Sequence, residues 1–177
     1  FDHYLATDPP YRMTYWHRYA DLEAAAMVGR IDWGLDYIRR HWGQALQLGV
    51  TSLWEAFDPS WIGEDPHAVS MIAAEYARYG GYETSLCHGW SAGPAAWLHR
   101  AVLGISPTAP GFAAVRFAPE LGSLRHAEGT IPTPQGPIHV CLDRGSTGAR
   151  RAQLQVPQGI AVELFEGVRE SWDVHRR

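Results

Sequence analysis

Apolar residues recur at helical spacing from the start of the chain to about residue 103, and glycines or prolines interrupt the pattern. This periodicity predicts helices over residues 13–28, 32–48, 66–79 and 91–103. Gly29, Gly49 and Gly104 follow three of these helices and act as stop signals, because glycine readily adopts the left-handed conformation that ends a helix. Short connections favour antiparallel neighbours, so we expect two helical hairpins with long loops between and after their helices.

The first predicted helix is apolar around most of its circumference. Trp16, Tyr19 and Met27 share one face, and Tyr15 and Leu22 lie on an adjoining stripe. The second predicted helix also has apolar residues at helical spacing: Ile31, Leu35, Ile38, Trp42 and Ala45. Surfaces of this kind need neighbouring helices to cover them.

Helical spacing ends near Ile105, and alternation of apolar and polar residues replaces it. Residues 138–142, 152–156 and 160–164 alternate in this way, as strands with one buried face do. Prolines and glycines mark the turns between them. We expect at least five strands in this part of the chain, arranged as a small antiparallel β-sandwich. The predicted fold class is therefore mixed, helical and then all-β, with domains at residues 1–104 and 105–177.

The composition is that of an ordinary globular protein, with 46% hydrophobic and 19% charged residues. The net charge of −4 argues against a nucleic-acid partner, because phosphate binding needs a clustered basic surface. No apolar run reaches the length of a membrane span, so no membrane partner is expected either. Cys87 and Cys141 lie far apart and form no metal-binding spacing, and we expect no cofactor and no metal.

Aromatic residues are unusually frequent, with eight Trp and eight Tyr in 177 residues. Indole and phenol rings offer a flat apolar face and a polar tip, which suits the C–H faces and hydroxyl rims of sugars. Large aromatic residues also fill cores and interfaces. The composition is thus compatible with a carbohydrate site and equally with a rich core.

The sharpest motif match is Gly89-Trp90-Ser91-Ala92-Gly93, which has the Gly-x-Ser-x-Gly pattern of the serine-hydrolase nucleophile elbow. That chemistry requires the serine on a strained turn between a buried strand and a helix. Residues 82–88 do not have the pattern of a buried strand. Asp143 and His175 would complete the order Ser, Asp, His, but both lie in the predicted β domain. We therefore interpret the match as fortuitous.

Glu55 is the candidate catalytic carboxylate. It lies between Trp54 and Phe57, in a loop that follows a helical hairpin. Aromatic neighbours lower the dielectric constant around a carboxylate, and such an environment is typical of catalytic acids and bases. A glutamate that caps a helix or pairs with an arginine has the same sequence context, so both interpretations stay open.

His88 is the second candidate, as a residue that binds a sugar hydroxyl. The helical spacings that hold zinc are absent around it, which disfavours a metal-ligand role. In a chain with nine His residues, a buried and hydrogen-bonded structural histidine is also common. Asp58, Glu64 and Asp65 offer further carboxylates for a pair with Glu55, although loop positions like theirs are more typical of solvated turns.

Several stretches together resemble one enzyme family, the bacterial α-L-rhamnosidases of glycoside hydrolase family 78. One is Thr-Ser-Leu-Trp-Glu-Ala-Phe-Asp-Pro at residues 51–59, and another is Ser-Leu-Cys-His-Gly-Trp-Ser-Ala-Gly-Pro at residues 85–94. The remaining pieces lie at residues 10–11, 31–43, 103–112 and 127–138. The resemblance covers most of the chain and is weakest after about residue 145.

The resemblance implies the late helical hairpins of an (α/α)₆ barrel, followed by a C-terminal β domain. It implies an inverting hydrolase that releases terminal α-L-rhamnose from glycosides or polysaccharides, without a cofactor. In that family the glutamate after a tryptophan in the late barrel is taken as the general base, which corresponds to Glu55. His88 corresponds to a sugar-contacting histidine, and Trp54 and Trp90 are expected to line the pocket.

The chain departs from the family pattern in one important respect. An inverting mechanism uses two carboxylates, about 6.5–9.5 Å apart, and the acidic stretch expected to supply the general acid is missing. Only two of the six hairpins of the barrel are predicted here. We therefore expect a C-terminal portion of the enzyme that is inactive when isolated and that associates with the rest of the barrel or with itself through exposed apolar faces.

Two other functions remain as alternatives. One is a six-hairpin glycosidase with a different sugar in its pocket, and the other is a non-catalytic carbohydrate-binding or structural module that uses the β domain. No signal peptide is recognisable in the sequence, which favours neither a cytoplasmic nor a secreted location.

Overall fold

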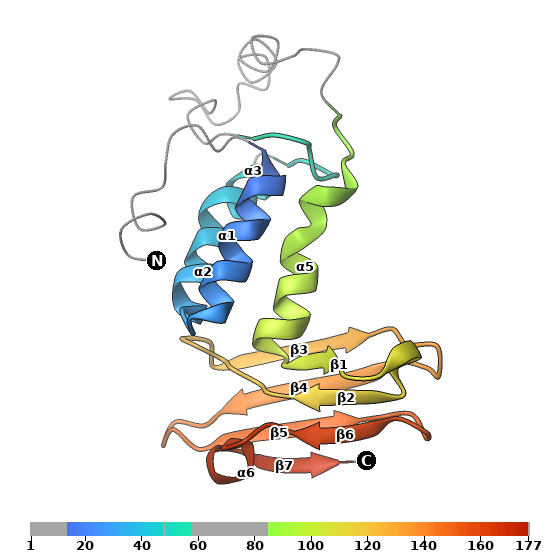
Figure 1. The fold of residues 1–177 in the computed structure, drawn as a ribbon. Helices are drawn as coiled ribbons and strands as arrows, with labels where there is room; N and C mark the ends of the chain where they lie inside the picture. The colour runs from blue at the N-terminus through green and yellow to red at the C-terminus, as the bar shows by residue number, and fades with distance from the viewer. Residues whose placement is uncertain (1–13, 48, 58–84, 177) are drawn as a thin grey trace. The chain divides into compact units, whose positions relative to one another are not determined.

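The computed structural model describes residues 14–47, 49–57 and 85–176. Contacts within the chain divide it into two compact units, residues 1–95 and 96–177, each described here by itself. Figure 1 shows helices in the first part of the chain and strands in the second. The predicted order of a helical part followed by β-sheets is thus confirmed.

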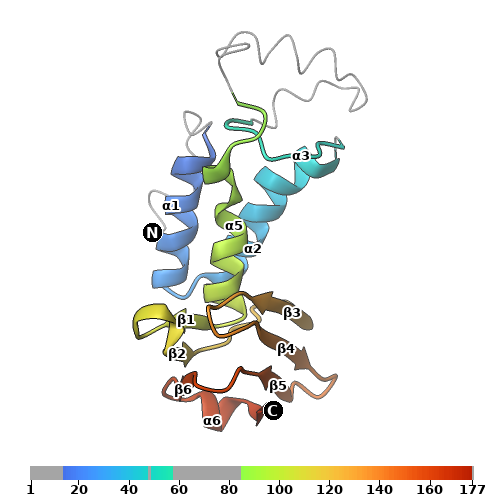
Figure 2. The same cartoon turned by 90° about the vertical axis from the view of Figure 1, so that its right-hand side faces the viewer.

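The first unit contains the predicted N-terminal helical hairpin. Helix α1 spans Tyr15–Met27 and ends at Gly29, whose φ of 71° lies in the left-handed region. Helix α2 spans Ile31–Ile38 and continues through a π-helical turn, η1 (Arg39–Gly43), into α3 (Gln44–Gln47). Helices α1 and α2 pack against each other, as Figure 1 shows, and Figure 2 gives a second view of the same helices.

The buried face of α1 differs from the one expected. Trp16 and Met27 are exposed, whereas Tyr15 and Leu22 are fully buried. Two charged residues, Arg18 and Asp21, are also buried. Charged residues are normally expected on the solvent side of a helix. They can be buried where other buried groups form hydrogen bonds with them.

The Tyr37 hydroxyl on α2 forms hydrogen bonds with both charged side chains at the contact between the two helices. Its hydroxyl donates a hydrogen bond of 2.8 Å to Asp21 Oδ2 and accepts one of 3.3 Å from Arg18 Nη1. The same Arg18 nitrogen lies 3.0 Å from Nε2 of the buried His41. Burial, together with the Asp21 carboxylate, raises the pKa of the Tyr37 phenol, so it remains a neutral donor.

The predicted helix at residues 91–103 consists of three consecutive pieces. A 3₁₀ turn, η4 (Gly89–Ala92), leads into α5 (Gly93–Trp97) and then into a π-helical turn, η5 (Leu98–Val102). Gly104 follows with a φ of 76°, in agreement with its predicted role as a stop. The predicted helix at residues 66–79 lies outside the described residues.

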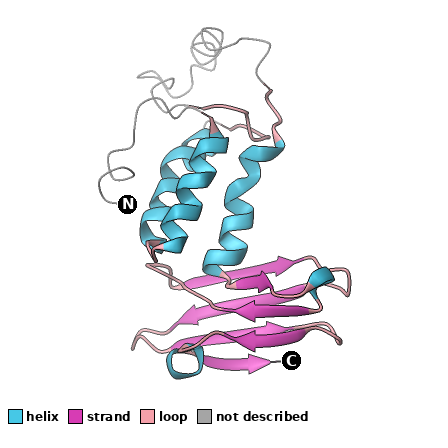
Figure 3. Cartoon of the chain, in the orientation of Figure 1, coloured by secondary structure: helices cyan, strands magenta, loops and turns pink. Residues whose placement is uncertain are grey.

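The second unit contains seven strands in two sheets, shown in magenta in Figure 3. The strands are β1 (Ile105–Pro107), β2 (Ala114–Phe117), β3 (His126–Ile131), β4 (Ile138–Arg144), β5 (Arg150–Gln155), β6 (Ala161–Leu164) and β7 (Asp173–Arg176). A 3₁₀ turn, η6 (Pro110–Phe112), and a short helix, α6 (Val168–Ser171), connect some of them. One sheet has the order β1-β2-β6 and the other β3-β4-β5-β7.

Most strand pairs are antiparallel, as predicted, but two are not. The pairs β1–β2, β3–β4 and β4–β5 are antiparallel, whereas β2–β6 and β5–β7 are parallel. Each parallel partner enters its sheet after the chain has passed through other elements, because a parallel pair cannot be joined by a tight hairpin. The expectation of a purely antiparallel domain is therefore wrong at these two edges.

Both sheets contribute to one hydrophobic cluster. Val115 and Phe117 come from one sheet and Ile138, Leu142 and Leu154 from the other, and none of these side chains is more than 2% exposed. Along β4 the burial alternates with each residue, as the sequence pattern predicts. In Figure 2, β1, β2 and β6 lie on one side of this unit and β3, β4 and β5 on the other.

Among the residues that the structure describes, no helix combines the length and the apolar character needed to cross a bilayer.

Candidate functional site

The backbone of Glu55 is held between two other segments of the first unit. Its N–H donates a hydrogen bond of 2.8 Å to the carbonyl of Ser85, and its carbonyl accepts one of 3.4 Å from the N–H of Tyr15, at the beginning of α1. His88 N–H donates to the Leu53 carbonyl at 2.8 Å. Residues 53–55 therefore run beside residues 85–88, which brings two distant parts of the sequence together.

The Glu55 carboxylate faces this second segment. Its Oε2 accepts a hydrogen bond of 3.1 Å from the N–H of Ser85 and lies 3.7 Å from Nδ1 of His88. Both side chains are about a quarter exposed, at 26% for Glu55 and 27% for His88. Among the described residues, no donor binds the other carboxylate oxygen.

Aromatic rings border the Glu55–His88 pair. The His88 ring lies 4.1 Å from the Trp90 ring, centroid to centroid, and Trp90 lies 6.0 Å from Trp16 on α1. Trp90 and Trp16 are 41% and 57% exposed, so part of each side chain is open to solvent. Sugars are commonly bound on such rings, with polar groups beside them that bind the hydroxyls.

Trp54, the other predicted sugar-contacting tryptophan, is half-buried. Its ring is edge-on to Phe57, at 6.4 Å between centroids. Its backbone carbonyl accepts a hydrogen bond of 2.7 Å from the Ser91 hydroxyl. The structure thus brings Trp54, Glu55, His88 and Trp90 together in one unit.

Ser91 does not have the environment of a nucleophile. It lies in the 3₁₀ turn η4, its side chain is fully buried, and its hydroxyl is used by the Trp54 carbonyl. The described residues before it, 85–88, form no strand. A nucleophile elbow exposes its serine after a buried strand, so this geometry agrees with a fortuitous motif.

Two contributors to the site were not expected from the sequence. Ser85 holds the Glu55 carboxylate through a backbone N–H, which any residue type except proline provides, so no sequence signal marks it. Trp16 was assigned to a packed face of α1, and its exposure became visible only in the folded unit. Asp58, Glu64 and Asp65, the other carboxylates considered, lie outside the described residues.

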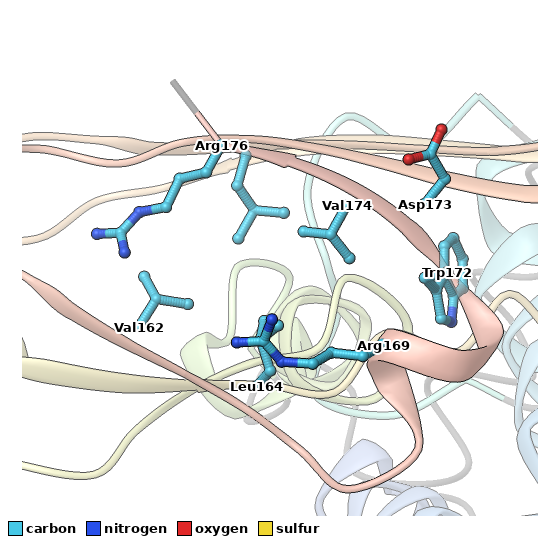
Figure 4. Close-up of a pocket in the computed structure, with 8 residues that line it drawn as sticks. Val162, Leu164, Arg169, Trp172, Asp173, Val174 and Arg176 are labelled. Carbon is cyan, nitrogen blue, oxygen red and sulfur yellow. The ribbon is translucent and has the colours of Figure 1, made fainter.

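The second unit has a concave feature of its own, a pocket of about 350 Å³ shown in Figure 4. Its lining combines aliphatic and charged residues: Leu154, Val162, Leu164, Arg169, Trp172, Asp173, Val174 and Arg176. Trp172 is only 5% exposed, so its ring offers no open stacking surface to a sugar. Arg176 Nη2 donates to the Ile160 carbonyl at 3.1 Å, and Asp173 pairs with Arg151 at 3.6 Å.

Three comparisons with known proteins point to the same enzyme family. A family model, the bacterial alpha-L-rhamnosidase C-terminal domain, matches residues 104–168. An alpha-L-rhamnosidase of Alteromonas sp. (strain LOR) is 29% identical over 124 residues, which cover 70% of this chain and 12% of that protein. A GH78 family rhamnosidase of Bacillus sp. GL1 has a similar structure, with a TM-score of 0.75 and 30% identity over 99% of this chain and 18% of that one.

A more distant structure shows the same fold. The alpha-L-rhamnosidase of Streptomyces avermitilis, solved in complex with L-rhamnose, has a TM-score of 0.52 and 21% identity, covering 70% of this chain and 11% of its own. The chain thus spans less than a fifth of the length of each of these relatives. The resemblance seen in the sequence is confirmed: residues 104–168 match the C-terminal domain of bacterial α-L-rhamnosidases, and the chain is similar over nearly its whole length to part of a GH78 family rhamnosidase.

Proposed function

We propose that this chain is the C-terminal portion of an inverting glycoside hydrolase that releases terminal α-L-rhamnose, with Glu55 as its general base. The observation that carries the proposal is the placement of the Glu55 carboxylate, 3.7 Å from His88 and beside the exposed Trp90 ring. The α-L-rhamnosidases related to this chain, one of them bound to L-rhamnose, support the choice of sugar.

Glu55 would act on the water that attacks the anomeric carbon. A general base must lie within hydrogen-bond reach of the proton that it removes. Oε2 of Glu55 is fixed by the Ser85 N–H, and Oε1 remains for the water. Fixing one oxygen orients the other, so the base needs little rearrangement before the reaction.

His88, Trp54 and Trp90 would hold the sugar ring. The His88 imidazole binds a hydroxyl, while the Trp90 face packs against the apolar C–H groups. Trp54 contributes from the half-buried side of the site. In this arrangement the rings exclude bulk water from one side of the sugar and leave the other side open to the attacking water.

The architecture that we propose for the complete enzyme is an (α/α)₆ barrel followed by a β-sandwich. Residues 1–104 would supply late hairpins of the barrel and residues 105–177 the sandwich. Inversion needs a second carboxylate on the opposite side of the sugar, about 6.5–9.5 Å from the first. We assign this general acid to a part of the enzyme outside these 177 residues, so the isolated chain should not hydrolyse an aryl α-L-rhamnoside.

The decisive experiment replaces Glu55 by glutamine in the complete enzyme. Glutamine keeps the size and can still accept the Ser85 hydrogen bond, but it cannot take a proton from water. We expect kcat on an aryl α-L-rhamnoside to fall by about 10²–10⁴-fold, with rhamnose affinity within a few-fold of the original. The matched control is Asp36→Asn, which removes a carboxylate paired with Arg39 at 2.7 Å on the same unit and should leave kcat unchanged. A Glu55→Gln enzyme with full turnover would reject the proposal.

The two alternatives are separated from it by simple measurements. A six-hairpin glycosidase for another sugar would cleave a different member of an aryl glycoside panel faster than the rhamnoside. A carbohydrate-binding module would bind sugar through residues 105–177 and keep that affinity when Glu55 and His88 are replaced.

A further inference from the structure

Four polar side chains form a compact block on the outward face of the sheet that contains β3 and β4. His126 and Glu128 are two residues apart on β3, and Cys141 and Asp143 are two residues apart on β4. The strand register pairs His126 with Asp143 and Glu128 with Cys141. Side chains two residues apart share a face, so these four are mutual neighbours.

The ligand-type atoms of this block are close together. One atom from each of His126, Glu128 and Cys141 lies within 4.8 Å of the other two. His126 Nε2 is 3.7 Å from Glu128 Oε2. The other nitrogen, Nδ1, is 2.8 Å from Asp143 Oδ1, and the Cys141 thiol donates a 3.6 Å hydrogen bond to Asp143 Oδ2.

We propose that His126, Glu128 and Cys141 form a binding site for a zinc-type divalent ion, with Asp143 as the residue that positions two of the ligands. Zinc bonds are about 2.0–2.2 Å to nitrogen and oxygen and about 2.3 Å to sulfur. Two tetrahedral ligands at these bond lengths are therefore separated by about 3.3–3.6 Å, and the 3.7 Å between His126 Nε2 and Glu128 Oε2 is about 0.1 Å longer. The side chains of His126 and Glu128 are 51% and 72% exposed and can move the short remaining distance.

Asp143 has the role that carboxylates have around many zinc-binding histidines. Because it accepts the Nδ1 proton of His126, it leaves Nε2 as the nitrogen that faces Glu128 and an incoming ion. Asp143 also orients the Cys141 sulfur. Three protein ligands leave a fourth tetrahedral position for water or an external ligand.

Charge at the block favours a cation. Glu128 and Asp143 are both negative at neutral pH, and Arg151, the register partner of Asp143 on β5, is the cation that acts on Asp143 from the other side. On binding, the thiol proton is released to solvent as the zinc–sulfur bond forms, and no oxidant or reductant is involved.

Motif searches along the sequence do not find this cluster. His126 and Cys141 are separated by a turn and have no recognisable zinc-ligand spacing. The pairing of β3 with β4 brings them together. The expectation of no metal site came from residue spacing along the sequence, which does not reveal contacts between strands.

The test is a titration of the purified full chain with Co²⁺ and then Zn²⁺ under reducing conditions. A thiolate bound to Co²⁺ gives a charge-transfer absorption in the near ultraviolet, which Zn²⁺ should displace. We expect this band to disappear in Cys141→Ser, and the Zn²⁺ affinity to fall at least tenfold in His126→Ala and in Glu128→Gln. Asp143→Asn should keep the band but weaken binding by about 10–100-fold, as for other residues that orient metal ligands.

The matched control is Cys87→Ser, because Cys87 is the other cysteine of the chain and is exposed. It should keep both the band and the affinity. Far-UV circular dichroism establishes that each variant is folded, and the conservative Glu128→Gln tests the site even if a cysteine variant unfolds. A band that persists in Cys141→Ser, or wild-type Zn²⁺ affinity no higher than that of His126→Ala, would overturn the proposal.

Discussion

The Ser91 hydroxyl donates a hydrogen bond of 2.7 Å to the backbone carbonyl of Trp54, the residue directly before Glu55. Ser91 is fully buried, and its own carbonyl accepts a 2.8 Å hydrogen bond from the Trp42 indole. Ser91, the serine of the Gly-x-Ser-x-Gly match, therefore connects the η4 turn to the segment that contains Glu55.

Replacing Ser91 by alanine should destabilise the first unit without creating or removing an esterase. The change removes the hydrogen bond that the fully buried Ser91 side chain donates to the part-buried Trp54 carbonyl, which costs about 0.5–1.5 kcal/mol. Denaturant unfolding followed by tryptophan fluorescence measures this loss. Ser171→Ala is the matched control, because the exposed Ser171 hydroxyl also donates to a backbone carbonyl, that of Gly167, and its removal should cost less than about 0.5 kcal/mol. Equal losses in the two variants would contradict the buried role of Ser91.

Replacing Tyr37 by phenylalanine should cost more stability than the same change at Tyr15. Both hydroxyls belong to buried tyrosines, but Tyr37 donates to the Asp21 carboxylate at 2.8 Å, whereas Tyr15 donates to the neutral His41 carbonyl at 3.2 Å. Hydrogen bonds to charged groups contribute about 1.5–3 kcal/mol and neutral ones about 0.5–1.5 kcal/mol. The denaturation midpoints of the two variants measure this difference in stability. A larger loss of stability in Tyr15→Phe than in Tyr37→Phe would contradict the prediction.

Gly104→Ala should destabilise the second unit far more than Gly148→Ala. Both glycines have positive φ, 76° and 87°, so alanine is strained at either position by about 1–2 kcal/mol. At Gly104 the added Cβ would also lie 2.4 Å from the carbonyl carbon of Ala118 and the nitrogen of Pro119, while nothing lies within 4 Å at Gly148. Thermal unfolding by far-UV circular dichroism should give a lower Tm for Gly104→Ala, by several degrees. Similar Tm values would mean that the backbone relaxes around the new methyl group.

The His126–Asp143 pair predicts a pH dependence that NMR can follow. The Asp143 hydrogen bond raises the pKa of His126 above its ordinary value, and His126 lowers the pKa of Asp143. The pair therefore stabilises the fold between these two pKa values. Its contribution is lost as the pH rises through the raised pKa of His126, and again as it falls through the lowered pKa of Asp143. In Asp143→Asn the His126 imidazole resonances should titrate at lower pH, and an unchanged titration would show that the pair does not form.

The local elements were predictable where one periodicity dominates. Strand β4 buries every second residue from Ile138 to Leu142, and glycines with positive φ follow α1 and η5 where stop signals were expected. Strands β1, β2, β3 and β7 were not predicted individually, and for β1, β2 and β7 the reason is that three or four residues carry too little pattern to distinguish a strand from a turn. The buried Arg18 and Asp21 were missed for a different reason, since their burial depends on Tyr37, on another helix.

The sequence by itself determined the order of helices and strands, the family resemblance, and which residue types are available at positions 54, 55, 88 and 90. These properties follow from local propensity and from short runs of neighbouring residues. Only the tertiary structure decided that Ser85 holds the Glu55 carboxylate, that Ser91 is buried, and that His126 meets Cys141. Backbone hydrogen bonds and strand register determine those contacts. The types of the contacting side chains do not predict either of them.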